Sequence, residues 1–532
     1  MRQTHTVCPP INPETHLADG AAMPPPEPPP PLDRTLIEAL RSHLRATSRQ
    51  PVVLIETHIS WVLLAGSLAY KIKKPVRLPF VDFSTLASRR RFCDIELQLN
   101  QRLAPQIYLE VVPVCGSPEA PRLGGGGAPI DYAVCMRRFA DGALLSEQLA
   151  AGRLHAAQLE QLAQGLADFH AHAPCADAAS PFGTPAAIVK AAREVIDRLE
   201  PHADARAIAV LRAWLAERAH SLEPLWRSRR AAGAVRECHG DLHLANAVQF
   251  EGEVLAFDCI EFDPELRWID VIYDLAFLTM DLRAHGRADL AARALDAWLQ
   301  RSGDLAGLSV LRFYEVCRAL VRALVASLRS PHSGPDYLAC ALALTAQTPA
   351  PRLLITHGLS GCGKSTIALQ LLERGDAVRL RSDVERKRLF GLRPLQSSAA
   401  HALDVYTTEA TQRTFDRLAD GARDALRAGW PVIVDAAFLR RSERQHFKAL
   451  AAELGVPFAI LHCHAAEAVL RHRVAERHAA GNDASEADVA VLQRQIDHHE
   501  PLGDDERAIA LDVATDGAVD VDALAARWLA GA

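Results

Sequence analysis

A short stretch in the C-terminal third constrains the fold of this chain more than any other feature. Residues 358–366 (Gly-Leu-Ser-Gly-Cys-Gly-Lys-Ser-Thr) match the phosphate-binding pattern G-x-x-x-x-G-K-[ST] at every required position. The apolar run 352–357 before it predicts a buried strand, and residues 364–373 after it predict a helix. Glycines let the backbone fold closely around phosphate oxygens, and a helix N-terminus directs N–H groups at an anion. The stretch therefore predicts a site for a nucleoside triphosphate.

Each part of this stretch has an expected task. Lys364 is predicted to reach the β- and γ-phosphates, and the Ser365 hydroxyl is predicted to bind Mg²⁺. The predicted phosphate-binding residues are Gly358, Ser360, Gly361, Cys362, Gly363, Lys364, Ser365 and Thr366.

The composition limits the class of protein. A chain of 532 residues with 49% hydrophobic content is long enough for two or three domains. Its net charge of −6 gives no reason to expect nucleic acid as a partner, and no apolar run has the length of a membrane span. The 11 cysteines are scattered without a C-x-x-C pair, which favours a reduced, cytoplasmic setting. The sequence does not indicate the oligomeric state.

The order of patterns divides the chain into three parts. Residues 1–33 are predicted to form a disordered tail, because 24–31 is proline at every position but Glu27. Residues 34–345 begin with strand patterns and continue with helical ones, which predicts a small β-rich lobe beside a larger helical lobe. In the first lobe, the glycines at 124–127 predict a hairpin loop between strands 110–114 and 132–137. Prolines near residue 350 mark the boundary to a second domain, 352–532.

A second group of chemical residues lies in the helical lobe. Residues 239–246 (His-Gly-Asp-Leu-His-Leu-Ala-Asn) precede two short strands joined at Gly252, and Asp258 follows directly. A carboxylate, an amide oxygen five residues on and an acid after a hairpin can together hold a metal-bound triphosphate and an attacking hydroxyl.

These residues resemble the aminoglycoside phosphotransferase family, a branch of the protein-kinase-like fold, over residues 50–330. The family's H-G-D-x-H-x-x-N loop is complete here. The resemblance implies that Asp241 is the catalytic base, that Asn246 and Asp258 bind magnesium, and that Asp274 is a structural acid behind the loop.

The same resemblance indicates a phosphate-binding lysine. Ala69-Tyr70-Lys71 is similar to the A-x-K of the third kinase strand, which makes Lys71 the expected α/β-phosphate lysine, with Glu96 as its ion-pair partner. Lys73 lies on the same strand face and remains an alternative. The sequence departs from the kinase pattern because no glycine-rich loop precedes Lys71.

The second domain alternates strands with helices, and its five short apolar strands predict a parallel sheet. Ligands bind beyond the carboxyl ends of such strands, where the phosphate loop, Asp383 and Asp435 all fall. Asp435 ends an apolar run in the form of a Walker B strand and is expected to support Mg²⁺. Asp383 is expected to accept the proton of a substrate hydroxyl while Arg386 binds an anionic group; helix capping by Asp383 is the alternative.

A helix bearing Arg473 and Arg477 precedes a Gly/Asn/Ser loop, the pattern of a lid that brings cations to the transferring phosphoryl group; a solvated helix face is the alternative. Residues 352–532 resemble small P-loop kinases of the gluconate, shikimate and polynucleotide kinase type.

The sequence thus predicts an α+β bilobal kinase-like domain followed by an α/β P-loop domain. We expect a tandem kinase that uses ATP and Mg²⁺ to phosphorylate hydroxyl groups of small molecules. The alternative is an ATP-hydrolysing switch whose degenerate kinase-like module binds a partner. A kinase of nucleic-acid ends would require a basic stripe that the sequence lacks.

Overall fold

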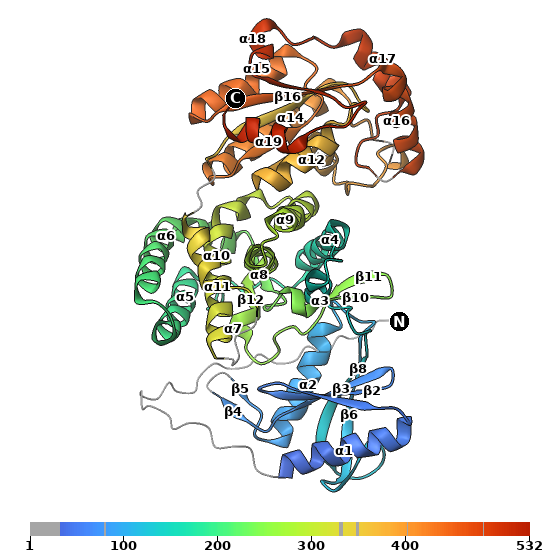
Figure 1. Cartoon of the computed structure of the whole chain (residues 1–532), viewed down its shortest axis with the longest axis vertical. Helices are drawn as coiled ribbons and strands as arrows, with labels where there is room; N and C mark the ends of the chain where they lie inside the picture. Colours follow the sequence, from blue (N-terminus) through green and yellow to red (C-terminus); the bar gives the residue numbers. More distant parts are fainter. Residues whose placement is uncertain are drawn as a thin grey trace.

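A computed structural model describes residues 32–78, 81–328, 334–346, 350–401, 403–481 and 483–531. The predicted proline-rich tail, apart from its last two residues, and residues 347–349 of the predicted boundary lie outside the described residues. The first helix begins at Leu32, inside the predicted tail. Three parts follow one another along the long axis of the molecule: a sheet lobe, a helical lobe and an α/β domain (Figure 1). Within the described residues, no helix combines the length and apolar character that crossing a bilayer requires.

The sheet lobe is a six-stranded antiparallel sheet with strand order β1-β2-β3-β8-β6-β7. Helix α2 packs on β6 and β8, and α1 packs on β1, β2 and β7. The two strands predicted to flank the glycines at 124–127 do pair antiparallel, as β6 and β8, but the connection between them also contains β7, which precedes the glycines and pairs with β6. The elements are α1 (Leu32–Ser48), β1 (Val52–Glu56), β2 (Ser60–Ala65), β3 (Leu68–Lys73), β4 (Arg77–Leu78), β5 (Val81–Asp82), α2 (Leu86–Asn100), β6 (Tyr108–Ser117), β7 (Ala120–Leu123) and β8 (Pro129–Arg137).

The helical lobe packs around α8, which is buried along most of its length. Its apolar residues surround the helix axis and do not form one stripe, so it has no amphipathic pattern in the sequence. The elements are α3 (Leu145–Ala150), α4 (Ala156–His172), α5 (Pro185–Leu199), α6 (Ala205–Ala231), β9 (Val235–Glu237), β10 (Ala247–Phe250), β11 (Glu253–Ala256), α7 (Pro264–Arg267), β12 (Trp268–Asp270), α8 (Val271–Ala284), α9 (Ala288–Ser302), α10 (Leu308–Ser327) and α11 (Tyr337–Ala346).

The α/β domain contains a five-stranded sheet, all parallel, with strand order β14-β15-β13-β16-β17. This confirms the predicted fold class, and it puts β13, the strand before the phosphate loop, at the centre of the sheet. The elements are β13 (Leu353–His357), α12 (Lys364–Gly375), β14 (Val378–Arg381), α13 (Ser382–Leu389), α14 (Thr408–Arg427), β15 (Val432–Asp435), α15 (Arg441–Leu454), β16 (Phe458–His464), α16 (Glu467–Ala480), α17 (Val489–His498), α18 (Asp504–Arg507), β17 (Ala510–Ala514) and α19 (Val521–Leu529).

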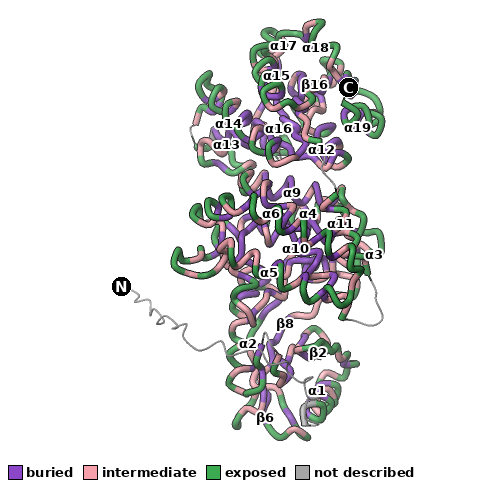
Figure 2. The backbone as a smooth tube through the Cα atoms, turned by 90° about the vertical axis from the view of Figure 1, so that its left-hand side faces the viewer, coloured by how far each residue is buried: buried purple, intermediate pink, exposed green. Residues whose placement is uncertain are grey.

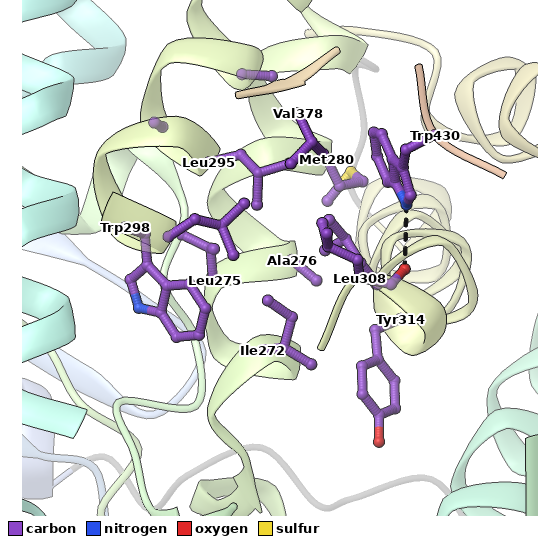
Figure 3. Packing of buried hydrophobic residues seen from close by; sticks show 14 of the residues in the cluster. Ile272, Leu275, Ala276, Met280, Leu295, Trp298, Leu308, Tyr314, Val378 and Trp430 are labelled. Carbon is purple, nitrogen blue, oxygen red and sulfur yellow. Dashed lines mark hydrogen bonds between the residues drawn. The ribbon is translucent and has the colours of Figure 1, made fainter. Parts of the chain in front are cut away.

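The α/β domain shares a hydrophobic core with the helical lobe. Val378 and Trp430 join a cluster of residues from α8, α9 and α10, and the Trp430 indole donates a hydrogen bond of 3.2 Å to the Leu308 carbonyl (Figure 3). Buried residues accordingly continue through the helical lobe up to its contact with the α/β domain (Figure 2). Arg283 of α8 also binds Asp376, just after α12, through hydrogen bonds of 2.7 and 2.9 Å. The two domains therefore pack as one body.

Candidate active sites

The loop 239–246 runs from β9 to β10 and is held in shape by its own side chains. The Asn246 amide donates to the Asp241 carbonyl at 2.9 Å and to its carboxylate at 3.1 Å. The His239 ring accepts from the Asp241 N–H at 3.2 Å and bonds the Phe257 carbonyl at 2.8 Å. His239 therefore joins the Asp241 loop to the segment that leads into Asp258.

The turn at Gly240 requires glycine. Its φ is +90°, and a Cβ there would lie 2.8 Å from the Leu266 carbonyl oxygen. A side chain would be strained by the backbone conformation and by this contact.

Asp274, on α8, supports this loop from behind. Its two carboxylate oxygens accept the backbone N–H groups of His239 at 3.0 Å and Gly240 at 2.9 Å. His170 contacts the same carboxylate at 3.1 Å, and the Trp298 indole donates to His170 at 3.2 Å. Burial would raise the pKa of Asp274, but His170 and the backbone donors lower it to about 2. A fully buried carboxylate thus fixes the loop.

We expect Asp274→Asn to lower the free energy of unfolding at pH 7 by about 3 kcal/mol, because an amide leaves one buried N–H facing an NH₂ group. Since the folded pKa is about 2 against 3.8 unfolded, this stabilisation is complete above pH 3.8 and is lost as the pH falls towards 2. Urea denaturation at pH 7 and at pH 3 measures both effects. Asp289→Asn, which breaks a partly exposed ion pair with Arg287, is the control and should cost under about 1 kcal/mol. Equal losses in both variants would contradict this role for Asp274.

Two lysines of β3 share one glutamate of α2. Lys71 Nζ lies 2.8 Å from one Glu96 oxygen, and Lys73 Nζ lies 2.7 Å from the other. Burial would raise the pKa of Glu96, but the two ammonium groups lower it below its ordinary value. Lys73 is fully buried and also pairs with Glu261, whereas Lys71 reaches Asp258 at 2.6 Å. The contact with Asp258 favours Lys71 as the lysine that faces a ligand.

Asp258 has an unusual backbone conformation. Its φ is +65°, and its N–H donates to the Tyr108 hydroxyl at 3.2 Å. Non-glycine residues adopt this region at a cost, and such residues cluster at functional sites. The Asp258 side chain is 42% exposed, and only one of its oxygens pairs with Lys71. Its remaining oxygen and Asn246 fit a hard cation such as Mg²⁺.

In the α/β domain, the phosphate loop joins β13 to α12. Gly358 has φ +140°, and a Cβ there would lie 2.2 Å from the Cys463 carbonyl oxygen, so only glycine fits. Lys364 Nζ donates to the Leu359 carbonyl at 2.8 Å, which folds the side chain over the loop. Cys362 is 1% exposed and its side chain packs in the core.

Ser365 and Asp435 meet beside this loop. The Ser365 hydroxyl donates to Asp435 Oδ1 at 3.1 Å, and Asp435 is 5% exposed. Asp435 Oδ2 accepts no hydrogen bond from the described residues, and the nearest cations, Arg379 and Arg381, lie 3.7 Å away. A hydroxyl and a buried carboxylate oxygen with an unused lone pair fit a hard cation. The residues present therefore fit Mg²⁺.

Most of the predicted residues of this domain line one pocket of about 820 Å³. Gly358 and Cys362 do not line it. The predicted residues that do are Ser360, Gly361, Gly363, Lys364, Ser365, Thr366, Asp383, Arg386, Asp435, Arg473 and Arg477.

The helix of the predicted lid, α16, contacts the phosphate loop directly. Arg473 donates to the Thr515 carbonyl at 2.7 Å and to the Gly361 carbonyl at 3.4 Å. Arg477 donates to the Ala487 carbonyl at 2.9 Å. The Asn482 position of the predicted lid loop lies outside the described residues.

Two residues that bond the backbone of the phosphate loop were not predicted from the sequence. Gln495 Oε1 accepts the Ser360 N–H at 2.8 Å, and Thr515 donates to the Cys362 carbonyl at 2.9 Å. Thr515 directly follows β17, so its position beyond the carboxyl end of a strand was a usable signal. Gln495 has no such signal, because only folding brings α17 to the loop.

Comparison with known proteins shows which class of protein this chain belongs to. The model of the phosphotransferase enzyme family matches residues 78–314, and the model of the AAA domain matches residues 353–502. The first match begins after β3 and ends in α10, and the second contains the phosphate loop. The chain is a two-domain protein with a kinase-like domain and a P-loop domain, which supports phosphoryl transfer in general.

One relative is similar enough to this chain to show the family to which the chain belongs. The uncharacterized protein Rv2004c of Mycobacterium tuberculosis is 32% identical over 458 residues, covering 83% of this chain and 90% of that protein. The chain therefore belongs to the same family as Rv2004c.

Two solved structures are each similar to part of the chain. One is a choline/ethanolamine kinase family protein from Mesorhizobium loti, 15% identical, covering 58% of this chain and 92% of that chain with a TM-score of 0.36. The other is a gluconokinase from Sinorhizobium meliloti, 20% identical, covering 35% of this chain and 92% of that chain with a TM-score of 0.25.

Proposed function

We propose that this chain is a tandem ATP-dependent phosphotransferase that moves the γ-phosphoryl group to hydroxyl groups of small molecules. The observation that carries the proposal is the pocket of about 820 Å³, in which Lys364, the Ser365–Asp435 pair and Asp383 line one cavity. This pocket combines a phosphate-binding cation, two oxygen ligands for a metal and a separate carboxylate for an acceptor. The ten cysteines of the described residues are all unpaired, which supports a cytoplasmic setting.

In the P-loop domain, the glycine-rich backbone and Lys364 bind the β- and γ-phosphates. Ser365 and Asp435 hold Mg²⁺, which when bound neutralises charge on these phosphates. Asp383 orients the acceptor hydroxyl and takes its proton. Arg473 and Arg477 of the lid line the same pocket and stabilise the charge of the transferring group.

Arg386 indicates the chemistry of the acceptor. It is 7% exposed and donates to the Val405 carbonyl at 3.0 Å and to the Thr411 hydroxyl at 3.2 Å, while its Nε has no partner among the described residues. No carboxylate of the described residues pairs with it. A buried guanidinium without a counter-ion favours an anionic ligand, so the acceptor carries a carboxylate or a phosphate beside its hydroxyl.

In the kinase-like domain, Asp241 is the base for a second acceptor. Asn246 and Asp258 hold Mg²⁺, and Lys71, paired with Glu96, binds the α- and β-phosphates.

The alternative, an ATP-hydrolysing switch with a partner-binding kinase-like module, has one observation in its favour. The turn 57–59 between β1 and β2 contains no glycine, although kinases cover the phosphates with a glycine-rich loop at this turn. The two functions differ in whether ATP consumption depends on an acceptor.

A screen for acceptor-dependent phosphorylation tests the proposal. The full chain, with Mg²⁺ and radiolabelled ATP, is incubated with alcohols that are neutral, carboxylated or phosphorylated. We expect a product that depends on Lys364 and prefers anionic acceptors, and Arg386→Gln should raise the KM of that acceptor by about 10- to 100-fold. ATP hydrolysis at one rate with every acceptor would instead support the switch.

A further inference from the structure

Arg379, on β14, lies between two carboxylates that belong to different domains. Its Nη2 lies 2.7 Å from Asp296 Oδ2 in the kinase-like domain. Its Nη1 donates to the Ser365 carbonyl at 3.3 Å and lies 3.7 Å from Asp435 Oδ2. All three charged side chains are buried, with Asp296 and Arg379 6% exposed and Asp435 5%. One guanidinium thus connects the domain interface to the predicted magnesium site.

Helix α9 of the kinase-like domain fixes the position of Arg379. The helix packs on both α12 and β14, and its Leu295 lies beside Val378 of β14 (Figure 3). Gln300, one turn after Asp296, donates to the Arg379 carbonyl at 2.8 Å and to Asp296 Oδ1 at 3.1 Å. The backbone and the side chain of Arg379 are therefore both held from the other domain.

The charges around Asp435 show what Asp296 does. Arg379 and Arg381 both lie 3.7 Å from Asp435, and each has a closer carboxylate elsewhere: Asp296 at 2.7 Å and Asp483 at 3.0 Å. Two arginines and three aspartates leave one net negative charge for a cation. Without Asp296 the group is neutral, and Arg379 is free to close onto Asp435.

We propose that Asp296 of the kinase-like domain is a positioning residue for the magnesium site of the P-loop domain. It holds Arg379 away from Asp435, so that the carboxylate stays available to the metal. This inference rests on the proposed binding of Mg·ATP by the P-loop domain, and it makes that site a composite of both domains.

The test measures magnesium dependence of nucleotide binding in the full chain. Asp258→Ala serves as the parent, because it removes a metal ligand of the kinase-like site. Fluorescence of mant-ATP is titrated with Mg²⁺ in this parent and with Asp296→Asn added. We expect Asp296→Asn to raise the Mg²⁺ concentration that gives the half-maximal fluorescence change by about tenfold. A loss of this size is typical when a residue that orients a metal ligand is removed. Affinity for metal-free mant-ATP should stay within twofold, since the loop binds phosphate without Asp435.

Two further variants distinguish a positioning role of Asp296 from a general loss of stability at the domain interface. Asp376→Asn breaks the Arg283 pair of the same interface, at the far end of α12, about 18 Å from the phosphate loop by helical rise. It should leave the magnesium dependence unchanged. In an Arg379→Gln background, Asp296→Asn should have less than a twofold effect, because the cation that it controls is absent.

The outcomes are distinct. A tenfold shift for Asp296→Asn that disappears with Arg379→Gln supports the inference. An equal shift with Asp376→Asn, or a shift that persists with Arg379→Gln, overturns it, and so does mant-ATP binding with no shift at all. A parent that binds no mant-ATP with Mg²⁺ overturns the proposed P-loop function and this inference with it.

Discussion

Substitution of Lys364 by alanine is expected to lower acceptor-dependent phosphoryl transfer by the P-loop domain by about 10²- to 10³-fold. Among the described residues, Lys364 Nζ bonds only neutral groups, the Leu359 carbonyl at 2.8 Å and the Cys362 sulfur at 3.7 Å. Its charge is therefore available to the phosphates and stabilises them most when charge develops in the transition state. Single-turnover transfer from radiolabelled ATP to an acceptor from the screen measures the effect.

The matched control for this prediction is Lys448→Ala, which removes an exposed lysine of α15 in the same domain. Both variants should have melting temperatures close to that of the unmodified chain, because neither side chain belongs to the core. Transfer within twofold of the unmodified chain by Lys364→Ala would show that the loop does not hold the reacting phosphate.

The second large effect is expected from Asp241→Asn in the kinase-like domain, where transfer should fall by about 10²- to 10⁴-fold. Burial would raise the pKa of Asp241, but His243 and His239 hold it below its ordinary value. The carboxylate therefore stays ionised throughout the neutral range, and its protonation should produce no fall in rate between pH 8 and pH 5. An amide at this position still accepts a hydrogen bond but cannot take the proton of the acceptor hydroxyl.

Asp141→Asn is the control for Asp241, because Asp141 is an exposed aspartate with a side chain 89% exposed. Rates are compared between pH 5 and pH 8 with an acceptor whose phosphorylation does not require Lys364. If Asp241→Asn transfers phosphate as fast as Asp141→Asn, the kinase-like domain is a binding module and the switch function is favoured.

The parts of the fold that could be predicted are those whose signal is local. The phosphate loop and β10 have complete local patterns, and the short apolar runs of the five parallel strands lie between helices. Helix α8 was missed because its apolar residues surround its axis, and β7 was missed because the glycines beside it indicate only a loop.

The residues of the candidate sites also differ in whether a local sequence pattern indicates them. The residues of the loop 239–246 are neighbours in sequence, whereas the preference for Lys71 over Lys73 depends on Asp258, which lies 187 positions away. Asp296 and Arg379 have no local signal at all. Each has the pattern of a solvated charge, and they are buried only because two domains pack against each other.

The central claim is that this chain contains two separate sites for Mg·ATP. Isothermal titration of the full chain with a non-hydrolysable ATP analogue and Mg²⁺ tests it most directly. We expect two molecules bound per chain, one after Lys364→Ala, one after Asp258→Ala and none when both are changed. A single bound molecule in the unmodified chain, lost entirely with either substitution alone, would contradict the claim.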